Sequence, residues 1–161
     1  MKLLVVSDSH GVLTGMEQAV LREQPDLIYH LGDCVRDADW LRERFFRIPL
    51  WNVAGNCDRG VSGPLQILDE VEGVRLLACH GHSYQVKTTL LHLYYAAREQ
   101  QATLCLYGHT HIPRLDARDG IQFFNPGAAG AGTPCYGVVT ISGGQAECSL
   151  RRVRKDEEDI R

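Results

Sequence analysis

Two imidazoles follow an apolar run in residues 104–111, and their spacing suits metal binding. The run stops at Gly108, and His109 and His111 then stand at positions i and i+2, where an extended backbone directs both side chains to one side. Neutral imidazole is a good ligand for zinc, manganese, iron and nickel, and ligands held at a strand end lose little freedom on coordination. Two neighbouring histidines are more often surface or hydrogen-bonded residues, so this pair alone is a weak signal.

The same arrangement, an apolar run followed by a polar cluster, occurs at four earlier places. These clusters contain Asp8 and His10, then Asp33, then Asn56, and finally His80 and His82. Residues just past the carboxyl ends of parallel strands meet at one rim of an α/β sheet, so we expect these side chains to converge. Without His82, these clusters and the pair His109 and His111 supply seven ligands. Seven ligands are too many for one ion but enough for two. Oxygen and nitrogen ligands without thiolate favour manganese, iron, zinc or nickel over magnesium.

Short apolar strands are the elements that must hold these clusters. We expect strands at residues 2–6, 27–31, 50–54, 74–79 and 104–107. The gap between the first two suits a crossover helix, which predicts a parallel βαβ unit. Beyond residue 107 the pattern predicts further strands with turns at 119–120 and 143–144 and a loop at 126–134.

Three helices are expected to cover the strands. The first begins with the capping-box pattern from Thr14 to Glu17 and has an apolar face. The second covers about residues 37–46 and has a solvated charged face. The third opens at Thr88 or Thr89, is the longest, and reaches about residue 101. Its expected inward residues are Leu90, Leu91, Tyr94 and Ala97, with Tyr95 also assigned to the core.

Length and composition indicate one domain in a reducing compartment. The chain has 161 residues, which predicts a single domain at 1–153, and residues 154–161 form a charged tail that we expect to fray. A net charge of −3 gives no basic field for nucleic acid. The six cysteines lack Cys-x-x-Cys spacing, and the N-terminus lacks a signal peptide's pattern. No apolar run approaches roughly 20 residues. We therefore expect reduced thiols, a cytoplasmic location and no membrane segment.

The clusters together resemble the signature of the calcineurin-like metallophosphoesterases. In that family's order, they read Asp8-Ser9-His10, Gly32-Asp33, Gly55-Asn56, His80 and Gly108-His109-Thr110-His111. The resemblance extends from residue 1 to about residue 128. The short length, Gly-Asn-Cys-Asp at 55–58 and Asn-Pro-Gly at 125–127 are most similar to the small bacterial and archaeal phosphodiesterase branch.

The resemblance implies a four-layer α/β/β/α sandwich of two mixed sheets flanked by helices, with a di-metal site. By the family pattern, Asp8, His10 and His111 hold one ion, Asn56, His80 and His109 hold the other, and Asp33 bridges both. The expected cofactors are two divalent ions, manganese first, with zinc, iron and nickel as alternatives. Small relatives also suggest a homodimer or homotetramer.

Such a site supports hydrolysis of small phosphodiesters. Two divalent ions about 4 Å apart lower the pKa of a bridging water, bind two phosphoryl oxygens and offset the charge of the in-line transition state, so that hydroxide attacks phosphorus directly. We assign catalytic roles to Asp33, as the bridging ligand, and to Asn56, whose amide can both coordinate and donate a hydrogen bond to phosphate.

One residue departs from the pattern of larger relatives, which carry Gly-Asn-His where this chain has Cys57. A thiol with a pKa near ~8.5 is a poorer acid for a leaving alkoxide than imidazolium near ~6.5. The change predicts a preference for diesters with good leaving groups. His82 and Asp58 are further candidates for the acid or for substrate binding.

Two other functions remain open at this stage. The first is a phosphomonoesterase or nucleotide phosphatase, which the same ligands would support. The second is a non-catalytic protein-interaction scaffold, the role ascribed to a relative in a eukaryotic trafficking complex whose metal site is degraded. Every ligand position is filled here, which favours an enzyme. His30, inside an apolar run, is expected to be a hydrogen-bonded core residue.

Overall fold

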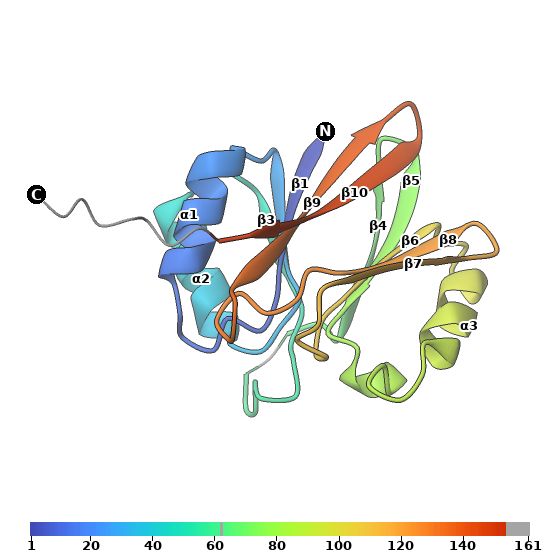
Figure 1. Ribbon diagram of the computed structural model, residues 1–161, viewed down its shortest axis with the longest axis horizontal. Coiled ribbons are helices and arrows are strands. Elements are labelled where there is room, and N and C mark those ends of the chain that lie inside the picture. Colours follow the sequence, from blue (N-terminus) through green and yellow to red (C-terminus); the bar gives the residue numbers. More distant parts are fainter. Residues whose placement is uncertain (62, 154–161) are drawn as a thin grey trace, which may run out of the picture.

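The computed structural model describes residues 1–61 and 63–153, so the predicted tail at 154–161 lies outside the described residues. Two five-stranded sheets lie face to face (Figure 1). In order across the first sheet are β10 (Gln145–Arg152), β9 (Cys135–Ser142), β1 (Lys2–Val6), β2 (Leu27–His30) and β3 (Leu50–Asn52). Across the second are β4 (Gln66–Val71), β5 (Val74–Cys79), β6 (Leu104–Tyr107), β8 (Ile121–Asn125) and β7 (Arg114–Arg118).

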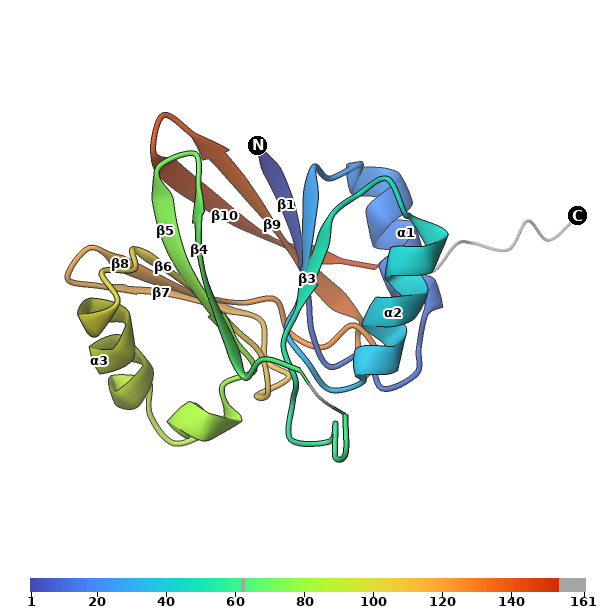
Figure 2. The same ribbon diagram turned by 180° about the vertical axis from the view of Figure 1, so that it is seen from behind.

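Both sheets are mixed, and helices cover their outer faces. Strands β1, β2 and β3 pair in parallel, as do β5, β6 and β8, whereas β9, β10, β4 and β7 pair antiparallel to their neighbours. Helices α1 (Thr14–Glu23) and α2 (Val35–Arg44) lie on one side of the molecule and α3 (Leu91–Glu99) on the other (Figure 2). The predicted sandwich of two mixed sheets flanked by helices is confirmed.

Alternating side chains divide the core of the described residues into three apolar clusters. In β1, Leu3 and Val5 face the second sheet, whereas Leu4 and Val6 face α1 and α2. A third cluster, which includes Leu93, lies between the second sheet and α3. Strands buried on both faces read as continuous apolar runs, which is why the sequence revealed them.

The predicted capping box at the start of α1 is wrong. Thr14 is the first helical residue, the N-cap position belongs to Leu13, and no side-chain cap hydrogen bond forms there. Leu13 already has helical backbone angles and packs against the core, so the apolar contact, rather than a hydroxyl, fixes the start of the helix. The predicted apolar face is confirmed, because Met16, Ala19 and Val20 are buried.

The third helix was predicted too long. It has nine residues against ten for α1 and α2, since it begins only at Leu91, after a short 3-10 helix, η1 (His82–Tyr84), and the turns that follow, and it ends at Glu99 rather than near residue 101. Leu91 at its start is exposed, and Leu93 occupies the core instead. Tyr94 is buried as expected, whereas Tyr95 is exposed, since neighbouring positions on a helix face different directions.

No described helix is long and apolar enough to cross a bilayer. All six cysteines lie among the described residues, and none of them forms a disulfide there. Cys79 and Cys105 are buried in the cluster beneath α3, where a thiol acts as a small apolar group.

Candidate metal centre

The loops that follow β1, β2, β3, β5 and β6 bring the predicted ligands together. Asp8, His10, Asp33 and His111 each offer a ligand atom, and these four atoms lie within 4.8 Å of one another. His111 Nε2 is 3.1 Å from Asp8 Oδ1 and 3.5 Å from His10 Nε2. Asp8 and Asp33 are buried, whereas His10 and His111 are exposed, so the cluster has an acidic floor and an accessible imidazole rim.

The other three predicted ligands lie on the opposite side of Asp33. His80 Nε2 is 3.1 Å from Asn56 Oδ1 and 3.5 Å from Asp33 Oδ1. The ring of His109 is 5.0 Å from that of His80, centroid to centroid. Asp33 Oδ2 lies 3.9 Å from His10 Nε2. The Asp33 carboxylate therefore faces both groups of ligands with different oxygens.

One oxygen of the Asp8 carboxylate shows that these residues fit a cation. Asp8 Oδ1 is buried and accepts no hydrogen bond from the described residues, although His111, His10 and His80 present Nε2 atoms at 3.1, 4.0 and 3.9 Å. A buried carboxylate oxygen without a partner is costly. A divalent cation between this oxygen and the imidazoles would satisfy it, and the oxygen and nitrogen donors suit a transition metal.

The backbone of the site is held in an unusual conformation. Five of the seven predicted ligands have positive φ angles, between 47° and 68°, where side chains other than glycine are uncommon. They are Asp8, His10, Asp33, His109 and His111. Each such residue costs of order 1 kcal/mol or more, which persists only where the surroundings enforce it. Five of the eleven non-glycine residues with positive φ in the described chain are therefore predicted ligands, and backbone strain of this kind occurs at many functional sites.

Two glycines let neighbouring loops approach the carboxylates. A Cβ at Gly55 would collide with the Asp33 carboxylate, and one at Gly108 would collide with the Ser7 hydroxyl and lie 3.0 Å from Asp8 Oδ2. The glycines before Asn56 and His109 in the sequence motifs are thus required by packing against the ligands.

Hydrogen bonds orient two of the buried ligands. Asp8 Oδ2 accepts from the Ser7 hydroxyl at 2.6 Å and from the His109 amide at 3.1 Å. His80 Nδ1 lies 2.7 Å from the Leu31 carbonyl, which can only accept, so Nδ1 carries the proton. The lone pair of His80 is therefore on Nε2, which faces the two aspartates.

The Asp58 carboxylate connects the loops that carry Asp33 and Asn56. Its Oδ2 accepts from the amides of Asp33 and Gly55 at 3.0 and 2.8 Å. Its Oδ1 accepts from the amides of Cys34 and Val35 at 2.9 and 2.8 Å. These bonds satisfy free amides at the start of α2, which begins at Val35 rather than near residue 37 as predicted. The contacts favour a positioning role for Asp58 over the acid role suggested by the sequence.

Electrostatics favour the metal-binding protonation state of two predicted ligands, His109 and Asp33. Burial and the neighbouring His80 imidazole lower the pKa of His109 to about 4. Burial alone would raise the pKa of Asp33, but the hydrogen bond from the Cys57 amide and the His80 imidazole hold it below its ordinary value. His109 is therefore neutral and Asp33 ionised at neutral pH, as coordination requires.

The two remaining acid candidates lie beside the ligands. The His82 ring is 5.4 Å from that of His80 and 6.1 Å from that of His109, and its buried Nδ1 has no hydrogen-bond partner within the described chain. Burial and the His80 imidazole lower the pKa of His82. Cys57 is exposed overall. Partial desolvation of its thiol, and the nearby Asp33 carboxylate, raise the pKa of that thiol. Neutral imidazole and neutral thiol are thus the forms present at neutral pH.

A buried hydrogen-bond network lies behind the ligands, and the sequence predicted only part of it. The Ser9 hydroxyl donates to Asp37 Oδ2 at 2.6 Å and lies 3.1 Å from His30 Nε2. The Gly11 amide donates to the same oxygen of Asp37 at 2.8 Å. His30 is the hydrogen-bonded core residue that the sequence predicted, but Asp37 is buried although its helix face was expected to be solvated. The network fixes the loop between Asp8 and His10 from behind.

The buried His30 predicts a measurable pH dependence of stability. Burial lowers its pKa from 6.5 to about 4. Between these two pH values, the imidazole is therefore protonated in the unfolded chain and neutral in the folded chain. The contribution of neutral, buried His30 to the free energy of unfolding is fully present above about pH 6.5 and is lost as the pH falls towards 4. By about pH 5 the loss is about 2 kcal/mol. Urea unfolding in chelator should show that His30→Gln loses less stability than the unmodified protein between about pH 7 and pH 5. Equal losses would contradict the assignment.

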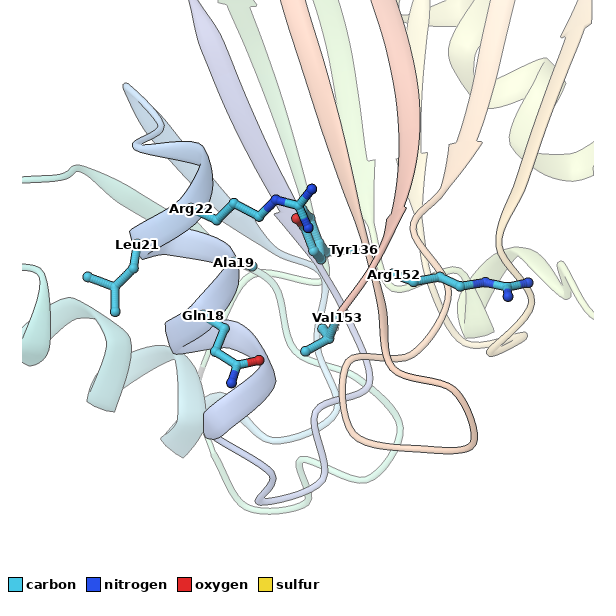
Figure 3. Close-up of a pocket in the computed structure, with 7 residues that line it drawn as sticks. All are labelled: Gln18, Ala19, Leu21, Arg22, Tyr136, Arg152 and Val153. Atoms are coloured by element: carbon cyan, nitrogen blue, oxygen red, sulfur yellow. The ribbon is translucent and has the colours of Figure 1, made fainter. Parts of the chain in front are cut away.

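A separate hollow lies between α1 and the end of β10 (Figure 3). It has a volume of about 480 Å³, and Arg22, Tyr136 and Val153 are among the side chains that line it. None of the seven predicted ligands contributes to its described wall. A second hollow, beside His111, adjoins the ligand cluster.

Comparison with known proteins agrees with the ligand geometry. Residues 1–144 match the family model described as the calcineurin-like phosphoesterase superfamily domain. A probable metallophosphoesterase of Bacillus subtilis, YsnB, is 31% identical over 148 residues, which cover 88% of this chain and 85% of that protein. Phosphodiesterase YfcE of Escherichia coli K12 is 28% identical, with 86% and 87% covered.

A solved structure shares the fold. A protein of Streptococcus pneumoniae TIGR4, described as a predicted phosphoesterase, superposes with a TM-score of 0.75 at 26% identity, over 93% of this chain and 97% of that one. The family match spans most of the chain and includes all seven ligand positions. The chain is therefore a member of the calcineurin-like phosphoesterase superfamily.

Proposed function

We propose that this protein is a metal-dependent phosphodiesterase that hydrolyses small phosphodiesters in the cytoplasm. The observation that carries the proposal is the buried Asp8 oxygen, which accepts no hydrogen bond within the described chain and faces three imidazole nitrogens. The similarity to YfcE, which is named a phosphodiesterase, supports diesters as the substrate class. The free thiols of all six cysteines support a reducing compartment.

Seven residues would hold two divalent ions. In this proposal Asp8, His10 and His111 hold one ion, Asn56, His80 and His109 hold the other, and Asp33 contributes to both. Manganese is our first choice, with zinc, iron or nickel as alternatives. When bound, such ions lower the pKa of coordinated water and offset negative charge on phosphoryl oxygens.

The chain's own groups would position the substrate. The Asn56 side chain turns its Oδ1 to His80, and its Nδ2 lies 3.4 Å from Cys57 Sγ on the exposed side. That amide can donate a hydrogen bond to a phosphoryl oxygen entering from the rim. The buried carboxylates of Asp8 and Asp33 would repel an anionic phosphate in the absence of cations, which makes metal loading a condition for binding.

The leaving group must depart with little help from a strong acid. The Cys57 thiol has a raised pKa and the His82 imidazole a lowered one, so neither is well matched to protonate an alkoxide near neutral pH. Esters of acidic alcohols, which leave as stable anions, should therefore be hydrolysed much faster than alkyl esters.

A paired chromogenic assay tests the proposal. With added manganese, bis(para-nitrophenyl) phosphate should be hydrolysed faster than para-nitrophenyl phosphate, because the diester carries less negative charge and both of its alcohols are good leaving groups. Faster turnover of the monoester would favour a phosphomonoesterase. No hydrolysis of either ester, together with no metal in elemental analysis of unchelated protein, would favour a protein-interaction scaffold.

A further inference from the structure

We propose that Arg152 binds an anionic group on the substrate, so that the preferred diesters carry a second negative charge on one ester arm. This inference rests on the proposed function and narrows its substrate class. It follows from a hollow beside the ligand cluster, from the face of β10 on which Arg152 lies, and from the absence of a described partner for its guanidinium.

The hollow adjoins one of the seven predicted ligands, His111. It has a volume of about 460 Å³, and His111 forms part of its wall. Pro113, Ala131, Thr133 and Cys135 also line it, and Arg152 completes it. Sites for small molecules have volumes of this order. An ester arm of a phosphodiester held beside His111 can therefore extend into it, along mostly small and apolar side chains.

Arg152 lies on the face of β10 that looks towards the hollow. Arg152 pairs with Cys135 in the register of β9 and β10, so the two side chains share one face of the sheet. Cys135 on that face packs closely against Gly127 in the loop that follows β8, since a Cβ added at Gly127 would lie 3.2 Å from Cys135 Cβ. Arg152 borders both this hollow and the one between α1 and β10, and Figure 3 shows its side chain extending away from α1, whereas Val153 turns towards the helix. The nearby guanidinium also lowers the pKa of the Cys135 thiol, although burial outweighs it.

The guanidinium is available to a ligand. Among residues 1–61 and 63–153, no carboxylate or hydrogen-bond acceptor pairs with Arg152. Guanidinium presents a planar set of donors that matches carboxylate and phosphate groups. The ligand cluster would take the phosphodiester charge at one end of the hollow, and Arg152 would take a second anionic group in the same hollow.

Arg151 provides a matched control. It pairs with Tyr136 in the strand register, on the opposite face of β10, and Tyr136 packs in the cluster beneath α1 and α2. Its side chain is exposed, as is that of Arg152. Arg151→Gln and Arg152→Gln therefore remove the same charge from neighbouring positions, and only the second removes it from the hollow.

The test compares two para-nitrophenyl phosphodiesters, one with a propyl arm and one whose arm ends in a carboxylate. Arg152→Gln should lower kcat/KM for the carboxylate arm about tenfold, as expected for loss of a charge-assisted hydrogen bond, and leave the propyl arm unchanged. Arg151→Gln should change neither. Calorimetry with phosphonate analogues of the two diesters should show the same tenfold loss in affinity for manganese-loaded Arg152→Gln.

The outcomes separate this inference from the proposed function. If the unmodified protein does not distinguish the two arms in rate or affinity, or if both variants lose the preference equally, Arg152 does not bind the anion. If neither diester is hydrolysed, the proposed function fails, and the calorimetric comparison still decides the role of Arg152.

Discussion

Replacing Asp33 by asparagine is expected to lower kcat/KM for a chromogenic diester by at least about a thousandfold, because several kcal/mol of transition-state stabilisation depend on the bound ions. The structure gives the reason in the two directions of the carboxylate. Asp33 Oδ1 faces His80 Nε2 and accepts a hydrogen bond from the Cys57 amide, and Asp33 Oδ2 faces His10 Nε2. An asparagine keeps the shape but removes the charge, and it turns a donor group towards one set of ligands.

A steady-state assay over a range of manganese concentrations measures this effect. Asp39→Asn is the matched control, because Asp39 is exposed on α2 and pairs only with Arg42 among the described residues. Circular dichroism should show both variants folded. Activity of Asp33→Asn within about tenfold of the unmodified protein at saturating manganese would mean that Asp33 is not shared between the ions.

The proximity of the candidate site residues could be predicted from sequence because of where strands end. Asp8, Asp33, His80 and His109 each follow a strand that is buried on both faces, and such strands stand out as uninterrupted apolar runs. The carboxyl ends of parallel strands share one rim, so spacing along the chain translated into proximity in space. Here a local pattern was sufficient, since each run and its cluster are contiguous.

The support of the site could not be predicted in the same way, because it depends on contacts between distant segments. The Asp58 carboxylate accepts hydrogen bonds from amides 23 to 25 residues earlier in the chain and from that of Gly55. The Asp37 carboxylate accepts a hydrogen bond from the Ser9 hydroxyl, 28 residues earlier. A carboxylate in such a position has the same local sequence as a solvated one. The start of α2 shifted for this reason, and the start of α1 shifted because Leu13 packs against the core.

Two ions per chain are expected in the unmodified protein, and one in His111→Ala. Within the described chain, His111 contacts Asp8 and His10 but not the Asn56 side of the site. Its removal should therefore empty one position and leave Asp33, Asn56, His80 and His109 able to hold the other ion. Elemental analysis and calorimetric titration with manganese measure the number directly. His92→Ala is the control, because that imidazole is exposed on α3.

Metal binding should also stabilise the fold, because the ions bind ligands that only the folded chain assembles. At a free manganese concentration about a hundred times the dissociation constant, each site contributes about 2.7 kcal/mol to the free energy of unfolding, and the melting temperature rises by several degrees. Manganese should therefore stabilise His111→Ala about half as much as the unmodified protein and His92→Ala fully. A single ion in the unmodified protein and none in His111→Ala would show that the tight group around Asp8 is the whole metal centre, and would contradict the proposed pair of ions.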